Sequence, residues 1–162
     1  MSESLPQPIL IVDSDEQSID HIASGLKDSG YLVITAPDGY DGYVRARNEG
    51  PNVIIANDLL PYVSGFKLSK LIKSDDRHQN TKIIIMSNSS GPTIDKMFNQ
   101  SGADKMLEKP FQLKDVIWLI KEDKEQETKD GITNDQWSIP IHTGVFIGHR
   151  TSCREFLECN YL

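Results

Sequence analysis

Residues 9–16 read ILIVDSDE, a run of four apolar side chains that ends at an acidic group. A short continuous apolar run is typical of a strand that is buried on both faces, as the strands of parallel sheets are. In the next segment, 15–29, apolar residues recur at helical spacing, and Gly30 follows as a helix terminator. This stretch therefore predicts a buried strand followed by a helix that packs against it.

The same order of strand and helix repeats along the chain. Further strands are predicted at 31–36, 53–57, 82–87 and 105–107. Further helices are predicted at 40–49, 64–74, 93–101 and 112–122. Five strands that alternate with five helices through short connections favour parallel strands joined by right-handed crossovers. We therefore expect an α/β fold with a five-stranded parallel sheet and helices on both of its faces.

The composition narrows the class of protein. The 162 residues include 17 basic and 24 acidic side chains, so the formal net charge is −7. Such an acidic chain is a poor general platform for nucleic acid. No apolar run approaches the roughly 20 residues of a membrane-spanning helix, and the start of the chain does not resemble a signal peptide. We expect a cytoplasmic protein that binds neither nucleic acid nor a membrane.

The composition also divides the chain. Residues 1–122 carry the alternating pattern and are predicted to form the folded domain. Residues 123–130 (DKEQETKD) have no apolar side chain and are either a charged linker or an extension of the last helix. Residues 131–162 form a C-terminal tail of unknown fold, which holds both cysteines of the chain, Cys153 and Cys159.

Polar residues follow several of the predicted strands. They are Asp13 to Glu16 after the first strand, Asn57 and Asp58 at the third, Ser87 and Asn88 at the fourth, and Lys109 at the fifth. Open α/β sheets place their functional groups beyond the carboxyl ends of their strands. These residues are therefore the candidates for a functional site.

From about residue 8 to residue 122 the chain resembles the receiver domain of response regulators, the CheY-like module of two-component signalling. The motifs that carry the resemblance are ILIVD (9–13), NDLLP (57–61) with Gly65 after it, IMS (85–87), GAD (102–104) and LEKPF (107–111). The resemblance implies a flavodoxin-like (βα)5 fold. It also implies a cis peptide bond before Pro110.

In the receiver family an aspartate four residues before this proline accepts a phosphoryl group from a kinase histidine. Counting back from Pro61, that position holds Asn57. A carboxylate attacks phosphorus with its charge and its free lone pairs, whereas an amide delocalises its nitrogen lone pair. Asn57 is therefore not expected to be phosphorylated.

The family's acidic pair after the first strand, which binds Mg²⁺ together with the acceptor aspartate, reads Asp13-Ser14 here. Mg²⁺ is a hard cation that prefers charged oxygen ligands. We therefore expect no cofactor and weak or no Mg²⁺ binding, with Asp13 at most a weak ligand. Asp15 and Glu16 are interpreted as helix N-terminal charges.

Two other family positions are retained and one is changed. Ser87 matches the hydroxyl residue that senses the phosphoryl group, and Lys109 matches the lysine that contacts it. Met106 replaces the usual switch aromatic residue. We interpret Asp13, Ser14, Asn57, Ser87 and Lys109 as a degenerate phosphorylation pocket, without a catalytic residue, in a protein that is not an enzyme.

The resulting hypothesis is a pseudo-receiver that acts as a phosphorylation-independent interaction module. Its partner would be a histidine kinase, another regulator or a second copy of the chain. The proposed surface on the last strand and helix comprises Lys105, Met106, Lys114 and Trp118.

The sequence also offers alternatives to this hypothesis. The first is a Mg²⁺-dependent phosphoacceptor that uses Asp58 or another acid in a phosphorelay. Successive strand side chains point to opposite sides, so Asp58 should not point where residue 57 points, and we interpret it as an ordinary loop acid. A flavodoxin-type cofactor site is disfavoured because the first strand–helix turn is acidic and lacks glycine. The spacings of His142, His149, Cys153 and Cys159 match no common zinc pattern.

Overall fold

The computed structural model describes residues 6–126 and 145–146. Strands and helices alternate as the sequence predicts. The strands are β1 (Ile9–Val12), β2 (Val33–Ala36), β3 (Val53–Asn57), β4 (Lys82–Ser87) and β5 (Lys105–Glu108). The helices are α1 (Glu16–Asp28), α2 (Gly39–Glu49), α3 (Gly65–Lys73), α4 (Pro92–Ser101) and α5 (Leu113–Gln126). The predicted fold class is confirmed.

Two boundaries differ from the predictions, namely the start of the second strand and the end of the last helix. The second strand begins at Val33 rather than at residue 31 because the Tyr31 N–H donates to the Leu26 carbonyl and closes the end of α1. Helix α5 continues to Gln126, into the first half of the charged segment 123–130. Two elements were not predicted, namely a short 3₁₀ helix, η1 (Asp76–His78), and a two-residue strand, β6 (Val145–Phe146).

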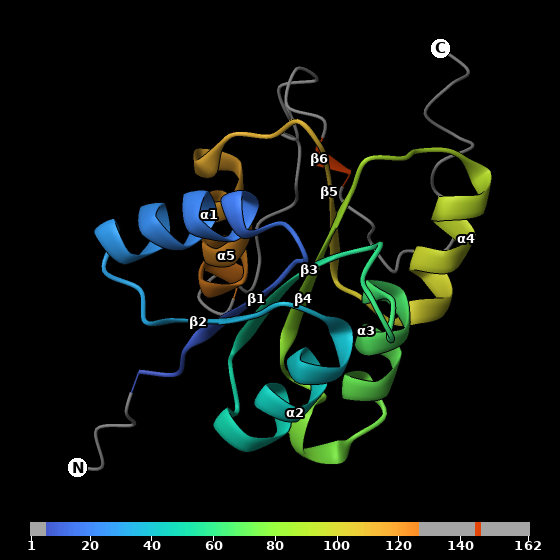
Figure 1. Ribbon diagram of the computed structural model, residues 1–162, viewed down its shortest axis with the longest axis horizontal. Helices are drawn as coiled ribbons and strands as arrows, with labels where there is room; N and C mark the ends of the chain where they lie inside the picture. Colours follow the sequence, from blue (N-terminus) through green and yellow to red (C-terminus); the bar gives the residue numbers. More distant parts are fainter. Residues whose placement is uncertain (1–5, 127–144, 147–162) are drawn as a thin grey trace.

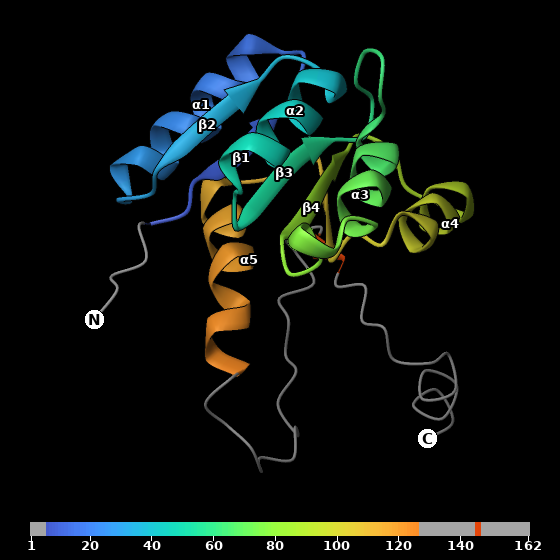
Figure 2. The ribbon, with the colours of Figure 1, turned by 90° about the horizontal axis from the view of Figure 1, so that it is seen from below.

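The five main strands lie parallel in the order β2-β1-β3-β4-β5, and β6 pairs with β5 in the antiparallel direction. Helices α1 and α5 cover one face of the sheet, and α2, α3 and α4 cover the other (Figures 1 and 2). Among the described helices, none is long and apolar enough to cross a membrane.

Each face of the sheet has its own hydrophobic core. The core under α1 and α5 contains Ile9, Ile11, Val53, Ile55, Ile84, Met86 and Leu107 from the strands. The core under α2, α3 and α4 contains Leu10, Val12, Ile54, Ala56, Ile83, Ile85 and Met106. Neighbouring residues of a strand point to opposite faces of the sheet. The same alternation therefore determines the face towards which each polar residue at the end of a strand points.

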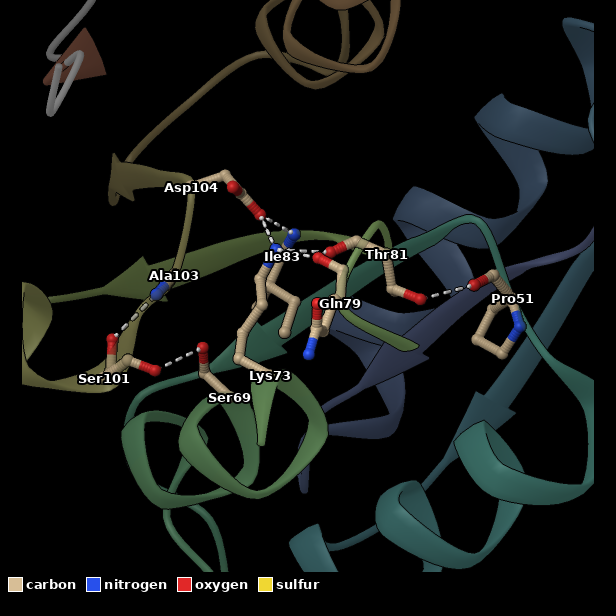
Figure 3. Close-up of polar contacts among 9 residues, drawn as sticks. All are labelled: Pro51, Ser69, Lys73, Gln79, Thr81, Ile83, Ser101, Ala103 and Asp104. Carbon is tan, nitrogen blue, oxygen red and sulfur yellow. Dashed lines mark hydrogen bonds and ion pairs between the residues drawn. The ribbon is translucent and has the colours of Figure 1, made fainter. Parts of the chain in front are cut away.

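At the end of the sheet where β4 and β5 begin, Lys73 is the last residue of α3. Its side chain contacts the segment before β4 and the turn before β5 (Figure 3). Its ammonium lies 2.7 Å from the Thr81 carbonyl oxygen, 3.2 Å from that of Gln79 and 2.8 Å from the Asp104 carboxylate. The same Asp104 oxygen accepts the backbone N–H of Ile83 at 2.8 Å. One side chain thus fixes the start of β4 and the turn before β5 to α3.

We predict that Lys73→Met lowers the free energy of unfolding by about 1–3 kcal/mol, because the carbonyls of Gln79 and Thr81 lose a charged donor. Lys70→Met, on the exposed side of the same helix, is the matched control and should change stability by less than about 0.5 kcal/mol. Urea unfolding followed by circular dichroism measures both. Equal effects of the two substitutions would contradict the role assigned to Lys73.

Candidate functional site

Three of the predicted pocket residues meet beyond the carboxyl ends of β1, β3 and β5. The Asn57 amide nitrogen donates to Oδ1 of Asp13 at 3.1 Å, and the Lys109 ammonium lies 3.4 Å from Oδ2 of the same carboxylate. Asp13 is fully buried and Asn57 almost so. We call Asp13, Asn57 and Lys109 the strand-end cluster. It lies on the side of the sheet covered by α1 and α5, as the alternation of the strands requires.

The local backbone places each member of the strand-end cluster. The Asp13 N–H donates to the Ala36 carbonyl at 3.2 Å, which carries the β1–β2 pairing one residue past the strand. Lys109 follows β5 and donates its backbone N–H to the Ser87 carbonyl at 2.8 Å. The Lys109–Pro110 peptide bond is cis. Gly65 packs so closely on β3 that an added Cβ would lie 2.2 Å from the Asn57 carbonyl oxygen.

Asp15 and Glu16, after Asp13, lie at the N-terminus of helix α1. Asp15 is its N-cap and accepts the Gln17 N–H at 3.1 Å, while its own N–H donates to Asp13. Glu16 lies in the first turn. Both have the helix N-terminal positions that the sequence analysis expected. Ser14 is exposed.

Ser87 does not join the strand-end cluster through its side chain. Its hydroxyl is fully buried and donates to Oδ2 of Asp58 at 2.6 Å. The backbone N–H of Ser89 donates back to that hydroxyl at 3.1 Å. The alternation of β3 and β4 puts both residues on the side of α2, α3 and α4. Asp58 therefore points away from Asn57, as expected.

The interpretation of Asp58 as an ordinary loop acid needs correction, since its side chain is only 3% exposed. Oδ1 accepts the Leu59 N–H at 2.8 Å, so both carboxylate oxygens are hydrogen-bonded. No signal in the sequence reveals this pair, because it depends on the register between β3 and β4. Asn57 pairs with Met86, and Asp58 is therefore the neighbour of Ser87.

The proposed interaction surface is also corrected in part. Lys105 and Met106 are 7% and 6% exposed, because β5 is covered on both faces and the Lys105 ammonium lies 3.1 Å from Glu122. Lys114 and Trp118 on α5 are exposed, with Trp118 at 45%. Only these two present side chains to a partner.

The strand-end cluster contains few oxygen atoms of the kind that bind a divalent cation. Asp13 is its only carboxylate, and both of its oxygens already have partners in Asn57, Asp15 and Lys109. The remaining candidate ligand is the Asn57 amide oxygen, which is buried and without a hydrogen-bond partner. Across the described residues, no group of three His, Cys, Asp or Glu side chains could hold a metal ion. His142, His149, Cys153 and Cys159 lie outside the described residues.

Comparison with known proteins identifies the family of the domain. Residues 9–121 match the family description "Response regulator receiver domain". Protein PilG of Pseudomonas aeruginosa is 31% identical over 115 residues, which cover 70% of this chain and 84% of PilG. The regulatory protein PhoP of Bacillus subtilis is 33% identical over 115 residues, which cover 70% of this chain but 46% of PhoP.

A solved structure shows the same fold. The CheY-like receiver domain protein of Methanospirillum hungatei superimposes with a TM-score of 0.69 at 27% identity, over 76% of this chain and 98% of that one. Fold, matched residues and relatives agree, and the chain belongs to the response regulator receiver domain family.

Proposed function

We propose that this receiver domain is a pseudo-receiver, which engages a signalling partner without being phosphorylated and without binding Mg²⁺. The observation that carries the proposal is the hydrogen bond from the Asn57 amide to Asp13. An amide donor supplies to Asp13 what a bound cation would otherwise supply, namely a positive group against a buried carboxylate. The strand-end cluster is therefore closed by its own side chains.

Charge supports the same proposal. With Asn57 neutral, the strand-end cluster contains one carboxylate and one ammonium, Asp13 and Lys109, at 3.4 Å. A divalent cation would have to compete with Lys109 for that single carboxylate. Ser14, at the place of the second family acid, is exposed and uncharged, so it offers little to the ion.

The alternative acceptor, Asp58, is not favoured by its surroundings. Its carboxylate is buried and its two oxygens accept hydrogen bonds from Leu59 and Ser87. It also lies on the opposite side of the sheet from Lys109. A phosphodonor would have to displace both hydrogen bonds and would meet no ammonium there.

The rim of the domain offers apolar surface for a protein partner. Leu59 and Tyr62, in the loop between β3 and α3, are 72% and 87% exposed, and Tyr40 at the start of α2 is exposed as well. Tyr62 has a φ of 65°, which costs a non-glycine residue on the order of 1 kcal/mol. A strained turn that displays an aromatic side chain supports an interaction role, alongside Trp118 and Lys114. A histidine kinase, another regulator or a second copy remain the proposed partners, in the cytoplasm.

Two predictions test the proposed function, and the first of them concerns phosphorylation. Incubated with Mg²⁺ and acetyl phosphate, the full chain should show no gain of one phosphoryl group in its intact mass. Asn57→Asp alone should restore little, because Ser14 still lacks the second acid. Asn57→Asp combined with Ser14→Asp should restore Mg²⁺-dependent labelling. Labelling of the unmodified chain would contradict the proposed function, and full labelling of the single variant would show that Ser14 matters little.

The second prediction concerns stability without metal. Asn57→Asp replaces a donor with a second carboxylate beside Asp13, and in EDTA at pH 7 it should lower the free energy of unfolding by roughly 1–3 kcal/mol. Asn52→Asp, at an exposed position, is the control. Thermal unfolding of the three proteins measures the difference, and a variant as stable as the unmodified chain would argue against the closure by Asn57.

A further inference from the structure

We propose that Asp58 is a built-in anion that holds Ser87, and through it the loop from β4 to α4, in one fixed conformation. The inference rests on the proposed function. In a domain that is not phosphorylated, Asp58 would fix the conformation of the loop before α4 without an external phosphoryl group. It assigns Asp58 a positioning role.

Asp58 makes four hydrogen bonds, two through its backbone and two through its carboxylate. Its N–H donates to the Met86 carbonyl at 2.8 Å, and its carbonyl accepts the Gly65 N–H at 3.0 Å. Its carboxylate accepts from Leu59 and from the Ser87 hydroxyl. The backbone bonds to β4 and α3 fix the position of the Asp58 Cα. The carboxylate is held towards Ser87 by its own two hydrogen bonds, which it would lose by rotating away.

The hydroxyl of Ser87 connects this rigid group to the loop. Its single proton has two acceptors in reach, Asp58 Oδ2 at 2.6 Å and the Ser89 carbonyl at 3.0 Å. The shorter contact to a charged oxygen is the stronger one. With its proton on Asp58, the hydroxyl oxygen is free to accept the Ser89 N–H at 3.1 Å. Asp58 thus sets the orientation in which Ser87 anchors the loop.

The loop has few other anchors on its inner side. A cavity of about 260 Å³ adjoins it, lined by Ser87, Ser89, Asp95 and Met106 among others. Helix α4 begins after Gly91, which has a φ of 120° and gives no side-chain cap. The position of the loop therefore depends on hydrogen bonds rather than on close packing, and the bond between Ser89 and Ser87 is the central one.

The charge of Asp58 favours the arrangement in which it binds Ser87. Within the described part of the chain, no ion pair joins Asp58 to a cation, and its carboxylate is 3% exposed. A buried carboxylate in that position is costly unless it is hydrogen-bonded. Releasing Ser87 would leave Asp58 with one donor fewer, so the engaged arrangement is strongly favoured.

The test follows the Ser89 amide by hydrogen exchange and ¹H–¹⁵N NMR of the full chain. Asp58→Ala should speed exchange at Ser89 at least tenfold and shift the signals of residues 88–92 and the first turn of α4. Ser87→Ala, which removes the acceptor itself, should affect the same residues, and the double variant should add little to either. Asp20→Asn, an exposed acid on α1, should leave these signals unchanged.

Unchanged exchange at Ser89 in a folded Asp58→Ala chain would overturn the inference. If that variant does not fold, Asp58→Asn decides, since it keeps the shape of the side chain and replaces the charge. It should give a smaller change at the same residues, and no change there would also overturn the inference. The mass measurement with acetyl phosphate is made on the unmodified chain, so failure of the proposed function is detected separately from failure of the Asp58 anchor.

Discussion

A parallel sheet that is covered by helices on both faces leaves each strand side chain only two directions, and successive residues must alternate between them. In this domain the apolar residues of the strands divide cleanly between a core under α1 and α5 and a core under α2, α3 and α4. The polar residues at the ends of the strands are divided between the same two sides of the sheet. Asp13, Asn57 and Lys109 meet on one side, whereas Asp58 and Ser87 meet on the other. The chemistry of each group follows from the neighbouring side chains that this alternation places beside it.

In both groups the buried carboxylate is hydrogen-bonded within the domain, and in different ways. On the α1 and α5 side, the Asn57 amide and the Lys109 ammonium surround one buried carboxylate. On the other side, a second buried carboxylate is held by a hydroxyl and a backbone N–H. Neither arrangement leaves a cluster of free anionic oxygens, which is what a hard divalent cation requires. A domain of this family can thus keep its scaffold while the strand ends are stabilised by hydrogen bonds.

The sequence was sufficient for the fold and for part of the site. Continuous apolar strands and helical spacing determine the elements, and the motifs place Asp13, Asn57 and Lys109 at the same edge of the sheet. The place of Asp15 and Glu16 at the start of a helix was predicted from the sequence, whereas the capping bond of Asp15 was not. The Asp58–Ser87 bond was missed because it depends on the register between β3 and β4, which a single sequence does not state. The burial of Lys105 was missed because its partner, Glu122, lies at the far end of another element.

The closed strand-end cluster bears on how such a domain would be controlled over time. A phosphorylated aspartate has a lifetime set by hydrolysis, so its signal decays when the kinase stops. The hydrogen bond between Asn57 and Asp13 contains no phosphoryl group and so has no such lifetime. Under the proposed function, the occupancy of a partner by this protein would follow its abundance, and synthesis and degradation of the chain would take the place of a phosphatase.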